Sequence, residues 1–132
     1  MVQAIPRIWR NAKQRYNLEG IHCEVCKESF FPKRTICPNC RRKGKLVEKQ
    51  MPNTGTIYSY SLVNSAPVGF EYEVPYFVAI VELDNGVKIF SQVVDSDPEK
   101  VKIGAKVKAV FRRVQAGTVE DVIAYGFKFM VV

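Results

Sequence analysis

Four cysteines, arranged as two Cys-x-x-Cys pairs, most strongly constrain how this chain can fold. Cys23 and Cys26 form the first pair, and Cys37 and Cys40 form the second after a gap of ten residues. Each pair turns the backbone so that two sulfurs can face one metal ion at about 2.3 Å. Two pairs joined by a short loop predict a tetrahedral tetrathiolate site for one structural zinc ion per chain.

The predicted metal site is closed, because four thiolates leave no coordination position for a water molecule or a substrate. We therefore expect that His22, the only histidine of the chain, is not a ligand. Two disulfides or four unrelated thiols are the alternatives, and neither explains why every cysteine falls into a pair. The ten-residue gap favours zinc over iron, although tetrathiolate sites accept either metal.

Positive charge is concentrated in the part of the chain that carries the cysteines. The 132 residues have a formal net charge of +7, but residues 1–50 alone carry twelve Lys or Arg against four Asp or Glu, a balance of +8. Residues 51–132 carry eight against nine, a balance of −1. This change predicts a boundary near residue 50, between a basic metal module and a near-neutral domain.

Residues 5–18 have the spacing of an amphipathic helix, with apolar side chains every three or four positions and Pro6 suited to the first turn. Two roles are open for this helix. It packs back on the rest of the chain, or Trp9 and its neighbours dock on a partner protein with basic residues at the rim. The candidate partner-binding residues are Trp9, Arg10 and Arg15.

Downstream of Gly55 the apolar pattern changes to the two-residue period of β-strands. Asn85-Gly86 is a strong hairpin signal, and Asp97 is expected to cap one helical turn between the third and fourth strands. Five strands in this arrangement match a small OB-fold barrel. The expected strands cover residues 56–63, 76–83, 87–94, 106–114 and 122–131.

The predicted fold class is therefore mainly β, with three parts in order along the chain. An N-terminal amphipathic helix is expected within residues 1–20, a rubredoxin-like zinc ribbon at 21–50, and an OB-fold domain at 51–132.

The sequence offers little for catalysis. The cysteines are committed to the metal, the carboxylates fall mostly in turns or at strand ends, and no phosphate loop or dinucleotide fingerprint occurs. We predict that the chain is not an enzyme. Its apolar runs are shorter than the roughly 18 residues that a membrane span needs, and its N-terminus does not resemble a signal peptide. Together with thiolate metal ligation, these features indicate a cytoplasmic protein.

Binding is the remaining class of function. Single-stranded nucleic acid is the generic ligand of a barrel of this kind. The barrel's net charge of −1 disfavours that ligand, because neutralisation of phosphates provides most non-specific affinity. The basic ribbon nevertheless keeps a nucleic-acid-binding protein as the alternative, and such binding would weaken steeply with salt.

An ordered series of short motifs runs along the chain. It comprises Trp9-Arg10, Arg15-Tyr16-x-Leu18-x-Gly20, the two cysteine pairs, Phe31-Pro32, Gly55-x-Ile57-x-Ser59-Tyr60, Ala66-Pro67-x-Gly69-Phe70, Pro75-Tyr76, Val81-Glu82-Leu83 and Ile103-Gly104. In this series the chain resembles, over nearly its full length, the archaeal and bacterial proteins of the domain of unknown function 35 (DUF35) family, which are zinc-ribbon and OB-fold proteins associated with acyl-CoA metabolism. Two departures are visible: Lys27 stands where a glycine often follows the first pair, and residues 127–129 lack a proline that is common near the end.

The resemblance implies a non-catalytic partner of thiolase-superfamily enzymes. Similar archaeal proteins hold an acetoacetyl-CoA thiolase and a hydroxymethylglutaryl-CoA (HMG-CoA) synthase in one complex at the entry to the mevalonate pathway. The expected function is thus a scaffold that bridges these two enzymes and helps to bind coenzyme A or an acyl-CoA as a shared ligand.

The candidate coenzyme A-binding residues lie mostly in or beside the loop that precedes the second expected strand. Phe70, Tyr72 and Tyr76 are the aromatic candidates, and Arg112 is the candidate phosphate contact. The alternatives are that the aromatic rings pack over the mouth of the barrel and that Arg112 is a solvated strand residue.

Overall fold

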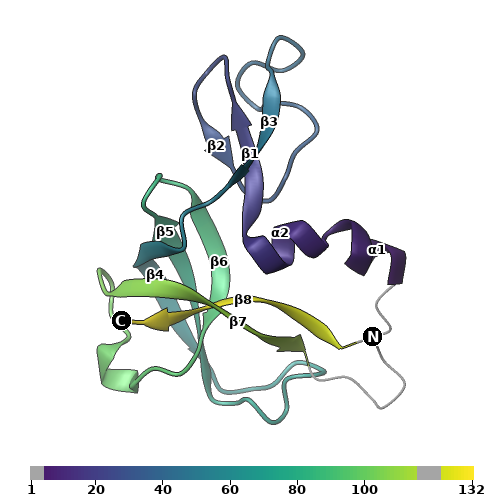
Figure 1. Ribbon diagram of the computed structural model, residues 1–132. Coiled ribbons are helices and arrows are strands. Elements are labelled where there is room, and N and C mark those ends of the chain that lie inside the picture. The colour runs from purple at the N-terminus through teal and green to yellow at the C-terminus, as the bar shows by residue number, and fades with distance from the viewer. Residues whose placement is uncertain (1–4, 116–122) are drawn as a thin grey trace.

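The computed structural model describes residues 5–115 and 123–132, and it shows a three-stranded ribbon standing on a five-stranded barrel, with two short helices beside their junction (Figure 1). The N-terminal elements are α1 (Ile5–Arg10), α2 (Ala12–Asn17), β1 (Glu19–Cys23), β2 (Ser29–Phe30) and β3 (Leu46–Gln50). The barrel elements are β4 (Thr54–Val63), β5 (Tyr76–Leu83), β6 (Lys88–Val93), the 3-10 turn η1 (Pro98–Lys100), β7 (Lys106–Gln115) and β8 (Ala124–Val131). The mainly β fold class with a ribbon before an OB-fold barrel is confirmed.

The single helix expected at residues 5–18 is two helices that meet at Asn11. Asn11 has a φ of −100° and a ψ of 7°, outside helical geometry, and its side chain makes no capping hydrogen bond. Leu18, with a left-handed φ of 53°, ends α2 and turns the chain into β1. Helices this short depend on tertiary packing, and α2 packs against β8.

The ribbon sheet has the strand order β2-β1-β3, with both pairs antiparallel. Gly20 lies where β1 runs close to its neighbours, since a Cβ atom there would stand 2.5 Å from the Phe30 carbonyl oxygen and 2.8 Å from Met51 Cε. The Met51 amide donates a hydrogen bond of 2.9 Å to the Leu18 carbonyl oxygen. The two chain segments that join the ribbon to the barrel and to α2 are therefore tied to each other.

The barrel closes in the order β4-β5-β6-β8-β7, with β4 pairing back to β7. All strand pairs are antiparallel except β6 with β8, which are parallel and share one register pair, Val93 with Phe129, among the described residues. The Val94 amide also donates to the Phe129 carbonyl oxygen at 2.8 Å. The barrel thus has one weak seam, between β6 and β8.

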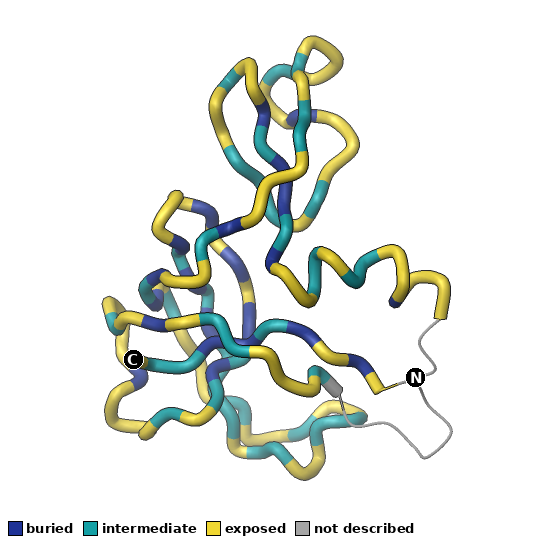
Figure 2. Tube along the Cα trace, viewed as in Figure 1, coloured by how far each residue is buried: buried dark blue, intermediate teal, exposed yellow. Residues whose placement is uncertain are grey.

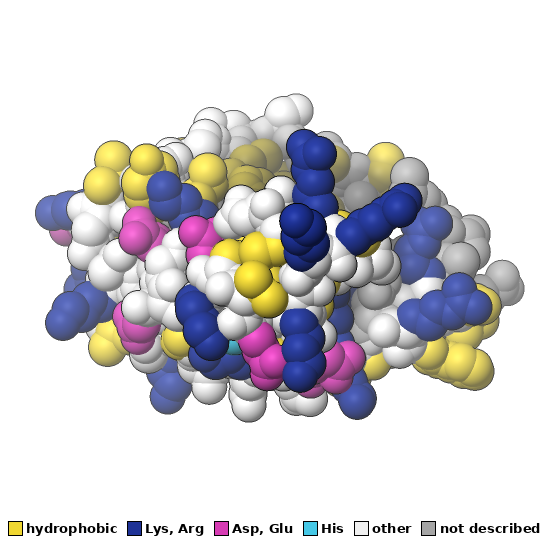
Figure 3. Space-filling view, turned by 90° about the horizontal axis from the view of Figure 1, so that it is seen from above, with side chains coloured by type: hydrophobic (Ala, Val, Ile, Leu, Met, Phe, Trp, Pro, Cys, Tyr) yellow, Lys and Arg dark blue, Asp and Glu magenta, His cyan; other side chains and the backbone are white. Residues whose placement is uncertain are grey.

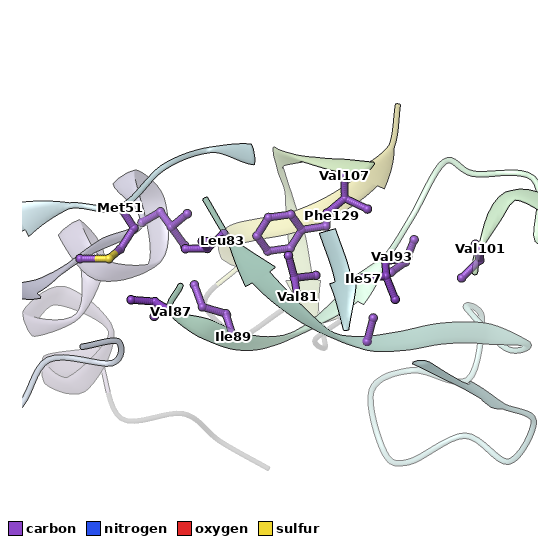
Figure 4. Close-up of a cluster of buried hydrophobic side chains, with 12 residues drawn as sticks. Met51, Ile57, Val81, Leu83, Val87, Ile89, Val93, Val101, Val107 and Phe129 are labelled. Atoms are coloured by element: carbon purple, nitrogen blue, oxygen red, sulfur yellow. The ribbon is translucent and has the colours of Figure 1, made fainter. Parts of the chain in front are cut away.

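The core fills the barrel with the inward side chains of its strands and continues toward the ribbon (Figures 2 and 4). Phe129 and Val81 are fully buried at its centre. Leu18 and Met51 belong to the same buried cluster, although they precede the barrel in the sequence. Ribbon and barrel therefore share one hydrophobic core at their junction.

Most predicted strand limits agree with the observed ones to within two residues. The first residue of the fifth expected strand, residue 122, lies outside the described part of the chain. The predicted hairpin turn is present, with Gly86 at a φ of +85°. The predicted cap is wrong in one respect: the Asp97 side chain makes no capping hydrogen bond and pairs instead with Lys100 Nζ at 3.1 Å. A single 3-10 turn is closed by the Lys100 amide and the Asp97 carbonyl oxygen, so it offers little to cap.

Candidate functional site

The four cysteine sulfurs converge at the end of the ribbon that is distant from the barrel. All four lie within 4.8 Å of one another, with 4.0 Å between the sulfurs of Cys23 and Cys40 and 3.6 Å between those of Cys26 and Cys37. A tetrahedron with metal–sulfur bonds of about 2.3 Å has edges of about 3.8 Å. The donor set therefore fits a tetrathiolate zinc site, in which the metal would join the two halves of the ribbon.

The two cysteine pairs have the same local backbone. The amide of Lys27 donates to the Cys23 carbonyl oxygen at 2.9 Å, and the amide of Arg41 donates to the Cys37 carbonyl oxygen at 2.8 Å. Lys27 and Arg41 both have positive φ, of 62° and 53°. This left-handed region favours glycine, which gives the physical reason that glycine suits the position after such a pair. Lys27 adopts the same backbone conformation at some cost in strain.

The environments of the sulfurs differ strongly. Backbone N–H groups, first that of Cys26, lower the pKa of the Cys23 thiol to about 6. Desolvation, followed by the neighbouring sulfurs, raises the pKa of the Cys40 thiol to about 12. Thiolates packed this closely repel each other, and a divalent cation among them favours the deprotonated form of all four.

His22 lies next to the first cysteine pair in the sequence, but its side chain contacts Ser29. Its Nδ1 is 2.9 Å from the Ser29 hydroxyl oxygen, a contact that joins β1 to β2. Within residues 5–115 and 123–132, the group of possible metal ligands consists of the four cysteines alone.

A lysine in the loop after β2 holds the ribbon to α2. Lys33 Nζ donates to Glu19 at 2.8 Å and to Glu48 at 3.0 Å, and its amide donates to the Gln14 side-chain oxygen at 3.3 Å. The Glu19 hydrogen bond raises the pKa of Lys33, and Lys33 in turn lowers the pKa of Glu48. Two residues earlier, Phe31 packs against the core of the barrel.

A cavity of about 560 Å³ opens along the weak seam of the barrel, where the ribbon and α2 approach it. Its apolar walls are Phe31 of the ribbon, Phe70 of the loop before β5, Tyr76 and Val78 of β5, Phe90 of β6 and Phe127 of β8. Phe31 and Phe127 touch edge to face, with ring centroids 5.5 Å apart. The cavity is therefore built from segments that are far apart in the sequence.

The structure brings some of the candidate ligand residues together and separates others. Phe70 and Tyr76 both line the cavity, with ring centroids 5.7 Å apart, and Arg15 lines it from α2. Tyr72 is 95% exposed and is not part of this lining. Arg112 lies at a neighbouring, more polar cavity of about 480 Å³, where its guanidinium pairs with Asp95 at 2.9 Å.

Three polar residues that the sequence did not single out lie between the two cavities. Lys128 is only 5% exposed, and its Nζ is 3.4 Å from Glu73 Oε2. The Gln92 side chain donates to the same oxygen at 2.7 Å. The sequence did contain a sign of this group, because Lys128 stands between two phenylalanines in an otherwise apolar strand. A lysine buried in such a strand needs a polar partner.

The candidate partner-binding residues of α1 face solvent. Trp9 is 74% exposed and Arg10 is exposed, while Ile8 is the buried residue of this helix. In α2, Tyr16 packs edge to face on Phe111 of β7, with ring centroids 5.3 Å apart. One helix therefore packs on the barrel and the other presents a tryptophan outward. Seen from above, lysine and arginine side chains are spread over the ribbon and helices, with a few acidic ones between them (Figure 3).

Both the ribbon and the barrel of this chain are similar to known protein families. The family model described as the ChsH2 rubredoxin-like zinc ribbon domain matches residues 10–46, and the one described as the ChsH2 C-terminal OB-fold domain matches residues 48–112. The chain is 49% identical over 129 residues to a DUF35 domain-containing scaffold protein of Methanothermobacter thermautotrophicus, covering 98% of this chain and 97% of the relative. A protein of the same description from Methanocaldococcus jannaschii is 46% identical, with 95% and 89% covered.

Other similarities are to proteins named as enzymes or enzyme complexes. A probable enoyl-CoA hydratase alpha subunit of Thermomonospora curvata is 33% identical over 100 residues, which cover 75% of this chain and 30% of that subunit. Among solved structures, a chain described as Ltp2-ChsH2(DUF35) aldolase superposes with a TM-score of 0.71 at 26% identity, covering 99% of this chain and 96% of that one. None of the described helices is long and apolar enough to cross a membrane.

Replacing one cysteine should remove the metal from the ribbon. We expect the purified wild-type chain to contain one zinc ion by elemental analysis, and Cys37→Ser to contain little, because three thiolates bind the ion less firmly. Ile36→Ser, an exposed neighbour in the same loop, should keep the full metal content. A wild-type chain with neither zinc nor iron would refute the metal site, as would a C37S variant that retains one ion.

Proposed function

Because this chain belongs to the DUF35 family of zinc-ribbon and OB-fold scaffold proteins, we propose that it is a non-catalytic subunit that bridges an acetoacetyl-CoA thiolase and an HMG-CoA synthase. In this role it also contributes to binding the coenzyme A moiety that both enzymes handle. The main support for this role is the similarity to proteins named as scaffolds, which covers nearly the whole length of both chains.

The metal site supports a structural rather than a catalytic role. Its four sulfurs leave no open coordination position. Within the described residues, neither cavity holds a histidine or cysteine among its lining residues, so neither offers the Ser–His or Cys–His pair that is common in acyl transfer.

The helices and ribbon offer a surface suited to enzyme partners. A tryptophan that is 74% exposed at the end of a short helix is costly to leave in water and is a common anchor of protein interfaces. The surrounding arginines, Arg7 and Arg10, are exposed and suit an acidic rim on the partner. We assign Trp9 and Arg10 to contact with the enzymes, whereas Arg15, the third candidate, is half-buried and lines the apolar cavity.

The two cavities together suit a ligand with one neutral and one charged end. Coenzyme A has this character, with a neutral pantetheine arm and a nucleotide that carries phosphates. The apolar cavity at Phe70 and Tyr76 suits the arm, and the polar cavity at Arg112 suits phosphates. The Arg112–Asp95 pair is about half exposed, so it stabilises the fold little and can be exchanged for a phosphate.

A shared acyl-CoA site has an energetic advantage. Condensation by a thiolase is unfavourable, and it advances when the next enzyme consumes its product. A scaffold that holds both enzymes near one ligand site would let the second enzyme consume the thiolase product before that intermediate is released.

The scaffold role predicts a stable three-component assembly. Purified from its native host through an affinity tag, the chain should elute from gel filtration together with a thiolase and an HMG-CoA synthase in fixed ratio. Nuclease treatment should leave this assembly intact, since nucleic acid does not hold it together. Elution of the chain alone, with neither enzyme able to shift it, would rule the role out.

Trp9 should contribute a large share of the affinity for at least one enzyme. We expect Trp9→Ala to weaken that binding about thirtyfold or more, because truncating a hot-spot tryptophan costs about 2 kcal/mol or more. The matched control is Tyr58→Ala, which removes another exposed aromatic ring, on β4. Titrations against each purified enzyme measure both variants, and equal affinities of W9A and wild type for both enzymes would show that α1 is not the anchor.

A further inference from the structure

We propose that the cavity at the seam between β6 and β8 is a binding site for a neutral aliphatic chain that carries amide or thioester oxygens, with Lys128 as its hydrogen-bond donor. This inference rests on the proposed function, because it assigns the arm of an acyl-CoA, rather than its nucleotide, to this cavity.

The seam itself creates the site. β6 and β8 run parallel and share a single register pair at Val93 and Phe129. The three residues that precede this pair along β6 and along β8 line the cavity, namely Phe90 to Gln92 and Gly126 to Lys128. The two strand edges therefore diverge at the cavity. A strand edge without a neighbouring strand presents backbone donors and acceptors, which suits a ligand chain with amides of its own.

The walls of the cavity select for an apolar chain. Its lining includes phenylalanine rings from the ribbon, the loop before β5, β6 and β8, together with Val63 and Val78. A volume of about 560 Å³ lies within the range of small-molecule sites. Gly126 allows β8 to approach Val114 and α2 closely, since a Cβ atom there would stand 2.9 Å from Val114 Cγ2 and 3.5 Å from the Arg15 carbonyl oxygen.

Lys128 gives the apolar cavity a polar recognition point. Its side chain is 6% exposed, and its Nζ lies 3.4 Å from Glu73 Oε2, a long contact for an ion pair. Gln92 donates to that same oxygen at 2.7 Å and so fixes the carboxylate. An ammonium group has three N–H donors, and an acceptor oxygen of a ligand would satisfy one more of them in a site shielded from water.

The charge balance in the cavity favours a neutral ligand. Glu73 already neutralises Lys128, and the other charged lining residue is Arg15 on α2. Phosphates buried here would lack enough cations to offset their desolvation. The nucleotide end of coenzyme A is therefore expected outside this cavity.

Three probes distinguish the parts of the ligand when titrated into the full-length metal-loaded chain by calorimetry and NMR. They are pantetheine, the octanoyl thioester of N-acetylcysteamine, and the adenosine bisphosphate that forms the nucleotide end of coenzyme A. We expect saturable binding of the first two, with chemical-shift changes at Gly126 and Phe127, which line this cavity but not the polar cavity at Arg112. We expect no shift of these two residues with the nucleotide. Binding of pantetheine alone would assign the cavity to the arm, and binding of the octanoyl thioester alone would assign it to the acyl chain.

Val78→Phe should block the cavity and weaken binding of these probes about tenfold or more, equivalent to about 1.4 kcal/mol. Ile80→Phe is the matched control, because Ile80 lies on the same face of β5 but not in the lining, and it should change the affinity less than about twofold. The double variant Lys128→Met with Glu73→Gln removes the buried pair without leaving one charge unpaired, and it should weaken binding while the chain stays folded by circular dichroism.

The site is refuted if neither neutral probe binds at millimolar concentration, if V78F binds as tightly as wild type, or if the nucleotide binds with the same sensitivity to V78F. The proposed function is separate from these outcomes. A chain that assembles with both enzymes but binds neither probe keeps its scaffold role and loses this site, whereas a chain that binds the probes but neither enzyme loses the scaffold role.

Discussion

The junction between Leu18 and Met51 is the contact on which the rest of the structure depends. Both side chains are almost fully buried in the cluster that fills the barrel, and a backbone hydrogen bond joins the two residues. Because the hydrophobic core extends through this junction, the ribbon and α2 are held in a fixed position above the barrel. On the surface, the ion pairs of Lys33 with Glu19 and Glu48 also hold the ribbon in this position. Partly exposed ion pairs stabilise less than buried apolar contacts.

The fixed position has functional consequences, because the cavity is formed between these parts and not within any one of them. Phe31 comes from the ribbon, Arg15 from α2, and Phe90 and Phe127 from the two strands of the seam. A metal held by the four cysteines would act at a distance from this cavity, by giving the ribbon a defined shape. The same geometry leaves Trp9 outside, on a helix whose neighbour is anchored through Tyr16 and Phe111.

Much of the fold could be predicted from the sequence, because its signals are local. The spacing of the cysteines, the two-residue period of the strands and the Asn85-Gly86 turn each depend on residues close together in the chain. The break at Asn11 was missed because the apolar spacing continues across it.

The candidate site was predicted only in part. Phe70 and Tyr76 meet in the cavity, but Tyr72 and Arg112 do not join them. Tyr72 lies in a loop, whose sequence does not fix the direction of its side chains. Arg112 lies on β7, where it pairs with Asp95, a residue 17 positions away. The Lys128–Glu73 pair joins residues 55 positions apart, a distance that no local pattern can bridge.

The proposed scaffold joins two enzymes, and counting the components of the assembly with and without the chain tests this role. Mass photometry of purified thiolase and HMG-CoA synthase should show no joint species for the two enzymes alone, and a species containing both when the chain is added. The scaffold role is refuted if the two enzymes associate equally well without the chain, or if the chain binds one enzyme and never recruits the other.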